Sequence, residues 1–126
     1  MAAKTALLVN GDRSTRLIYQ TLLEREGLAV FQAATGPEAL DQTERYLPDL
    51  IVQELSLGAW DGCDFIRAVK ASARTRHILF LVISAYVFET DQERVRLAGG
   101  DAFLPKPCLP SRMLVEVLRL LATPAP

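Results

Sequence analysis

Residues 48–62 read PDLIVQELSLGAWDG, and this stretch sets the organisation of the chain. A short apolar run at 50–52 is followed by one carboxylate, Glu54, and then by a loop that closes on the turn dipeptide Asp61-Gly62. An unbroken apolar run is typical of a strand buried on both faces of a parallel sheet. Ligands of open α/β sheets bind beyond the carboxyl ends of the strands, so this pattern predicts Glu54 at a functional rim. A surface-loop acid without a function is the alternative that this stretch alone leaves open.

The composition indicates one globular domain. The chain has 126 residues, enough to bury a core, and its 50% hydrophobic and 23% charged residues exclude a disordered chain. A net charge of -1 provides no basic surface for nucleic acid or an anionic membrane. The longest apolar run, 78–85, is too short to cross a bilayer, and the N-terminus has no signal-peptide pattern. We therefore expect a cytoplasmic protein in which Cys63 and Cys108 are small reduced hydrophobes.

Apolar runs alternate with helical periodicities along the rest of the chain. Strands are predicted at residues 6–9, 29–31, 50–52, 78–83 and 102–104. The predicted helices begin at Asp12 or Ser14, at Thr35, before Phe65, at Thr90 and at Pro110. The helix residues predicted to face the core are Ile18, Tyr19, Leu22, Leu23, Leu40, Thr43, Leu47, Phe65, Ile66, Val69, Val95, Leu97, Ala98, Leu114, Val117, Leu118 and Leu121. Arg67 and Lys70 are predicted to point away from the core.

Five strands alternating with five helices predict an α/β fold. Short connections of this kind require parallel strands with right-handed crossovers, hence a doubly wound five-stranded parallel sheet in a three-layer sandwich. The flavodoxin-like strand order 2-1-3-4-5 is expected because it places the ends of the first and third strands side by side at the switch point. Residues 1–123 would form this domain. Residues 124–126 would form a Pro/Ala tail, the stub of a linker to a further domain.

That strand order brings polar residues from several strand ends to one rim: Asn10, Gly11, Asp12, Glu54, Ser84 and Lys106. At this point the chain resembles the response regulator receiver domain of two-component signalling, over essentially its whole length. The stretches that carry the resemblance at the family's spacings are Pro48-Asp49-Leu50, Asp61-Gly62, Ser84-Ala85, Phe103 and Lys106-Pro107. The resemblance implies a phosphoacceptor at the end of the third strand, a Mg²⁺ site beside it and an aromatic switch residue at Phe103.

The departures from the family pattern concern the chemistry of the rim. Asn10-Gly11 replaces the acidic pair after the first strand, Glu54 replaces the phosphoacceptor aspartate, and Gly58 stands where the loop proline is expected. Mg²⁺ prefers hard oxygen ligands such as carboxylates, and Asn10-Gly11 provides no carboxylate. We therefore expect no metal or other cofactor. Asp12 and Glu54, with the backbone carbonyl of Ser56, are the candidates for a weakly held cation. Capping of the first helix is an equally good interpretation of Asp12.

The longer side chain of Glu54 predicts an ion pair with Lys106. Glutamate carries its carboxylate roughly 1 to 1.5 Å further out than aspartate, toward the place of a phosphoryl group and toward the ammonium. We therefore predict a pseudo-receiver that takes no phosphate, a regulatory module in a phosphorelay rather than an enzyme. The alternatives are a working phosphoacceptor that uses Asp12 or Glu54 and, on the same fold, a flavin or nucleotide site at the N-terminus of the first helix.

The resemblance also implies protein partners. Receiver domains commonly pair with themselves, or with output domains, through the fourth helix, fifth strand and fifth helix. On this chain that face is predicted to carry Arg94, Arg96, Phe103, Arg112, Glu116 and Arg119, with Leu120 as an exposed apolar contact. A fused output or kinase domain is a further expectation. Trp60 is either an anchor for a partner or a lid on the rim pocket.

Overall fold

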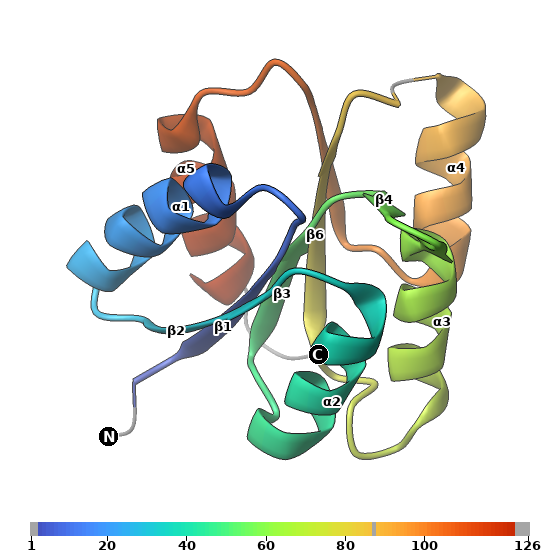
Figure 1. The fold of residues 1–126 in the computed structure, drawn as a ribbon, viewed down its shortest axis with the longest axis horizontal. Coiled ribbons are helices and arrows are strands. Elements are labelled where there is room, and N and C mark those ends of the chain that lie inside the picture. The colour runs from blue at the N-terminus through green and yellow to red at the C-terminus, as the bar shows by residue number, and fades with distance from the viewer. Residues whose placement is uncertain (1–2, 87, 123–126) are drawn as a thin grey trace.

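The computed structural model describes residues 3–86 and 88–122 of the 126-residue chain, so the predicted Pro/Ala tail lies outside the described residues. Figure 1 shows a central sheet with helices on both faces. The strands are β1 (Thr5–Val9), β2 (Ala29–Ala33), β3 (Leu50–Gln53), β4 (Ser56–Leu57), β5 (Trp60–Asp61), β6 (Leu79–Ser84) and β7 (Ala102–Pro105). The helices are α1 (Arg13–Arg25), α2 (Gly36–Tyr46), α3 (Gly62–Ala71), α4 (Glu89–Ala98) and α5 (Pro110–Ala122). None of the helices in these ranges is long and apolar enough to span a membrane.

The main sheet has five parallel strands in the order β2-β1-β3-β6-β7. Since β6 and β7 are the fourth and fifth strands of this sheet along the chain, the predicted order 2-1-3-4-5 is confirmed. Val9 lies opposite Ala33 on one side and Gln53 on the other. The amide of Glu54 continues this ladder, donating to the carbonyl of Val9 at 3.1 Å. The register therefore brings Asn10 and Glu54 together just beyond the ends of β1 and β3.

The sheet separates two hydrophobic cores, because successive side chains of a strand point to opposite faces. Leu7 and Val9 of β1 pack in the core covered by α2, α3 and α4. Ala6 and Leu8 pack in the core covered by α1 and α5. Figure 1 shows α1 and α5 together on one side of the sheet. These four residues of β1 are each at most 1% exposed, which explains why residues 6–9 form an unbroken apolar run in the sequence.

A short hairpin after β3 was not predicted. β4 and β5 pair antiparallel, with Ser56 opposite Asp61 and Leu57 opposite Trp60. Gly58 begins the two-residue connection with φ of 68°, a conformation that glycine adopts without a steric penalty and that tight hairpin turns require. The glycine found in place of the expected loop proline therefore forms a turn.

The predicted inner face of α5 is confirmed for Val117, which is buried, and for Leu114 and Leu121, which pack against the core, but it is wrong for Leu118. Its buried residues are Met113, Glu116, Val117 and Leu120, whereas Leu118 is 37% exposed. Glu116 and Leu120, predicted on an exposed interaction face, are each only 6% exposed. Glu116 is tolerated there because Arg112 and Arg119 both pair with its carboxylate.

Four more helix residues depart from the predicted pattern. Ile18 is 50% exposed and Leu97 is 71% exposed, so neither supports its helix from inside. Leu47 is not an inner residue of α2; it ends the helix in the left-handed conformation and is 37% exposed. Lys70 does not point away from the protein, since its ammonium donates to the carbonyl of Ile78 at 2.6 Å.

Candidate functional site

The centre of the rim is an ion pair between Glu54 and Lys106. Lys106 Nζ lies 3.2 Å from Glu54 Oε1, and the two side chains are 35% and 15% exposed. The other carboxylate oxygen of Glu54 accepts the amide of Leu55 at 3.2 Å. Lys106 is positioned by its own backbone, because its amide donates to the carbonyl of Ser84 at 2.9 Å. Both carboxylate oxygens of Glu54 are therefore engaged by groups of the protein itself.

The segment after β1 begins a helix. Asp12 is the N-cap of α1: its carboxylate accepts the amide of Thr15 at 3.2 Å and also the Thr15 hydroxyl. The hydroxyl bond, followed by the amide bond, lowers the pKa of Asp12. Asn10 turns its side-chain oxygen to the amide of Asp12 at 2.8 Å. Of the two interpretations of Asp12, capping is the one for which the contacts are present.

Two residues of α1 lie beside this rim: Arg16, which the sequence did not single out, and Tyr19, which was predicted to face the core but not to lie near the rim. Arg16 donates to the backbone carbonyl of Asn10 and, through Nε, to Gln32 on β2 at 2.9 Å. Tyr19 is 8% exposed, and burial first, then the charges of Cys108 and Glu54, raise its pKa. Neither residue follows from the strand-end pattern, because both belong to the covering helix rather than to the sheet.

The hydroxyl of Ser84 is hydrogen-bonded to the loop that follows β6. Ser84 is fully buried and its Oγ accepts the amide of Tyr86 at 3.1 Å. Ser56 is exposed on the hairpin. The sheet therefore brings Glu54, Ser84 and Lys106 to one rim, whereas the hydrogen bonds of Asp12 face its own helix.

The loop that follows Glu54 is tied to two helices. Asp61 Oδ1 accepts the amide of Cys63 at 2.8 Å, which caps α3, and Asp61 Oδ2 pairs with Arg94 of α4. Burial opposes ionisation of Asp61, but the Cys63 and Arg94 hydrogen bonds outweigh it and lower its pKa. Trp60 lies against α2, where a Cβ added at Gly36 would come within 2.6 Å of its Cγ. Trp60 is half-buried and packs against the core beneath α2, α3 and α4.

The oxygen donors at the rim do not fit an octahedral Mg²⁺ site, which needs several free hard oxygens. Gly11 has no side chain, the Asn10 oxygen is bound to Asp12, and the Asp12 carboxylate is bound to Thr15. Glu54 is bound to Lys106 and Leu55. Within residues 3–86 and 88–122, no three His, Cys, Asp or Glu side chains are grouped so that they could hold one metal ion.

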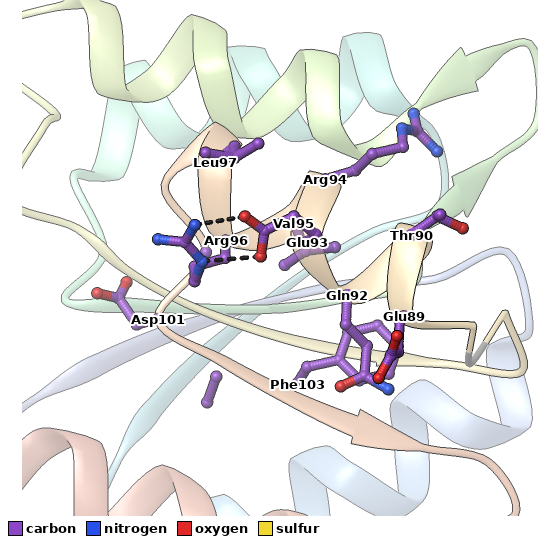
Figure 2. Close-up of a pocket in the computed structure, with 12 residues that line it drawn as sticks. Glu89, Thr90, Gln92, Glu93, Arg94, Val95, Arg96, Leu97, Asp101 and Phe103 are labelled. Carbon is purple, nitrogen blue, oxygen red and sulfur yellow. Dashed lines mark hydrogen bonds and ion pairs between the residues drawn. The ribbon is translucent and has the colours of Figure 1, made fainter.

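The predicted interaction face carries an open groove between α4 and β7. Figure 2 shows Glu93 and Arg96 paired across one turn of α4, with Phe103 of β7 on the groove wall and Arg94 pointing away from that pair. Phe103 is half-buried and packs against the core beneath α2, α3 and α4. Leu97, on the same groove, is 71% exposed. The accessible side chains of the groove are thus Arg96, Phe103 and Leu97, whereas Arg94 forms an ion pair with Asp61.

The fold is that of one class of signalling module. The sequence model of the response regulator receiver domain matches residues 6–118, so the chain belongs to the response regulator receiver domain family. Members of this family are regulatory modules of two-component signalling. They interact with kinases, other proteins or output domains, and they generally bind Mg²⁺ at the phosphorylation site.

Particular relatives agree with this assignment. The chain is 27% identical over 114 residues to the polar-differentiation response regulator DivK of Brucella ovis, which covers 90% of this chain and 93% of that protein. A putative response regulator from Chloroflexus aurantiacus is 27% identical, with a TM-score of 0.88 and coverage of 97% of this chain and 100% of that chain. The chemotaxis response regulator CheY4 of Vibrio cholerae, at 23% identity, shares the fold with a TM-score of 0.88 over 94% of this chain and 99% of its own.

Proposed function

We propose that this receiver domain regulates partner proteins by contact and takes no phosphoryl group at Glu54. The observation that supports this proposal is the Glu54–Lys106 ion pair, in which the residue at the phosphoacceptor position is already bound to the rim's only ammonium among the described residues. We place the protein in the cytoplasm as part of the same proposal.

The chemistry of phosphoryl transfer explains why the pair matters. Catalysis of this reaction depends almost entirely on alignment and on positive charge that neutralises the transferring group. Glu54 is displaced outward relative to an aspartate, and a misplacement of about 1 Å can cost 10²-fold in rate. Lys106, which would otherwise stabilise the added negative charge, is occupied by Glu54. The rim therefore lacks both the alignment and the free positive charge.

The domain would signal through the groove between α4 and β7 and the adjoining outer face of α5. Arg96, Leu97 and Phe103 are accessible there, and Arg112 and Arg119 are about half exposed while they neutralise the buried Glu116. A surface with apolar and basic groups suits a protein partner, including a second copy of this chain. Light scattering after size-exclusion chromatography tests the second copy, because a strict monomer at high concentration removes self-pairing.

A titration with beryllofluoride and Mg²⁺ tests the absence of phosphate chemistry. No saturable change is expected in the fluorescence of Trp60 or in amide NMR spectra. Intact mass after incubation with acetyl phosphate and Mg²⁺ is expected to be unchanged. A saturable response, or a mass gain that Glu54→Gln abolishes, would overturn the proposal.

A matched variant shows that the assay can respond. Asn10→Asp, Gly11→Asp and Glu54→Asp together restore the acids that the family pattern has. The change at position 11 is sterically open, because a Cβ there meets nothing within 4 Å. The triple variant is expected to respond to beryllofluoride. If neither the unmodified protein nor the triple variant responds, the missing acids do not explain the lack of a response to beryllofluoride.

A further inference from the structure

An open pocket of about 430 Å³ lies between the β4–β5 hairpin and the start of α4. Its walls include Trp60, Asp61, Tyr86, Asp91 and Arg94, and neither Glu54 nor Lys106 lines it. The volume falls within the range of about 300–1,000 Å³ that is usual for small-molecule sites. This pocket is thus separate from the ion pair on which the proposed function rests.

The side chains that line this pocket carry more negative than positive charge. Arg94 is bound to Asp61, and this pair is neutral. The partly buried carboxylate of Asp91 forms no ion pair within 4 Å with any residue that the structure describes, although its charge acts on Arg94 after that of Asp61. Arg67, which does not line the pocket, pairs with Asp64, and its charge also favours the ionised form of Asp61. The side chains that line the pocket therefore carry a net charge of -1, from two carboxylates and one guanidinium, and Asp91 is the carboxylate that is not hydrogen-bonded to Arg94.

Two aromatic side chains line the same pocket. Trp60 is held in place because its ring lies against Gly36 at the start of α2. Tyr86 is 53% exposed, and its amide is fixed by Ser84 Oγ at 3.1 Å. Aromatic faces attract cations through the quadrupole of the ring, and tryptophan does so most strongly. A carboxylate beside two such rings is a favourable environment for a positive group.

We propose that this pocket binds an organic cation, a guanidinium or alkylammonium group, with Asp91 as its counter-charge and Trp60 and Tyr86 as its aromatic walls. An anion would face Asp91 and would find Arg94 already bound to Asp61. A neutral apolar ligand would strip water from Asp91 without replacing its hydrogen bonds. The cation comes either from a free amine or from a basic side chain of a partner protein, and the two sources share this chemistry.

A purely structural role for Asp91 must be separated from binding. Asp91 is in the first turn of α4, where an acid also stabilises the positive end of the helix dipole. Glu89 lies in the same turn and is also acidic, but it does not line this pocket. Glu89→Gln is therefore the matched control for Asp91→Asn, since both remove one negative charge from the same helix end.

The fluorescence of Trp60, the only tryptophan in the chain, reports on binding. The full chain is titrated with butylguanidinium and with butylurea, a neutral compound of similar shape. Butylguanidinium is expected to give a saturable change and butylurea none. Asp91→Asn is expected to weaken the affinity by about tenfold, as loss of one partly buried ionic contact would. Glu89→Gln is expected to leave it unchanged.

Comparison of a peptide with a free cation identifies the source of the positive group. A capped arginine-containing peptide that binds more tightly than butylguanidinium supports a partner's side chain, and equal affinities support a free cation. The proposal fails if butylguanidinium gives no saturable change, if butylurea acts equally, or if the two acid variants weaken binding to the same extent. Amide NMR shifts confined to residues 56–61 and 86–94 provide an independent readout of the binding position.

Discussion

Substitutions that break the Glu54–Lys106 ion pair measure how much it contributes to the free energy of unfolding. Two unit charges 3.2 Å apart attract by about 5 kcal/mol at an effective dielectric constant of about 20. The Lys106 side chain is 35% exposed and the Glu54 side chain 15% exposed, so solvent screening and desolvation remove most of that value. We expect a coupling free energy of about 1 kcal/mol, at the upper end for exposed pairs.

A double-mutant cycle measures this coupling. Glu54→Gln, Lys106→Met and the double variant are unfolded in urea and followed by the fluorescence of Trp60. The exposed pair of Asp41 and Arg45, at 3.6 Å with side chains 64% and 63% exposed, is the control and should couple by no more than about 0.3–0.5 kcal/mol. A Glu54–Lys106 coupling no larger than that of the control would refute the reasoning that this pair neutralises the rim.

Two further predictions concern packing and pH. Gly36→Ala is expected to lower the free energy of unfolding by about 1–3 kcal/mol, because the new Cβ would lie 2.6 Å from Cγ of Trp60. Equal losses in urea for Gly11→Ala, whose Cβ meets nothing within 4 Å, would contradict this steric explanation. The hydrogen bond from Arg119 outweighs burial and lowers the pKa of Glu116 below 4.5, so its stabilising effect is complete above that pH and disappears as the pH falls through the folded-state pKa. Glu116→Gln should therefore flatten the acid limb of the stability profile; parallel profiles for the two proteins would argue against it.

The centre of the sheet could be predicted from sequence because β1, β3 and β6 are buried on both faces. Leu50, Ile51 and Val52 are each at most 3% exposed, and that burial is what the apolar run records. Glu54, Ser84 and Lys106 could be placed at one rim because each follows an apolar run within two residues, close to the end of its strand. The roles of these residues stay predictions.

Only part of the buried face of α5 could be predicted in the same way, namely Leu114, Val117 and Leu121. Apolar residues occupy most positions from Met113 to Leu121, so the periodicity does not select one stripe, and the acid Glu116 falsely indicates the outer side. Its burial depends on two arginines one turn away on either side. The hairpin was missed because each of its strands has only two residues, too few for an alternation to be recognised.

The pair of Arg94 and Asp61 has no local signature either, because the two residues are 33 positions apart and α4 carries several other charges. Asp61 nevertheless uses one oxygen for each of two helices: Oδ1 begins α3 at the amide of Cys63, and Oδ2 binds Arg94 on α4. A partner protein that binds α4 and displaces it would move the guanidinium of Arg94 away from Asp61, the residue that caps α3. Asp61 would then be held by the Cys63 amide alone, so we expect faster hydrogen exchange at that amide when a partner displaces α4.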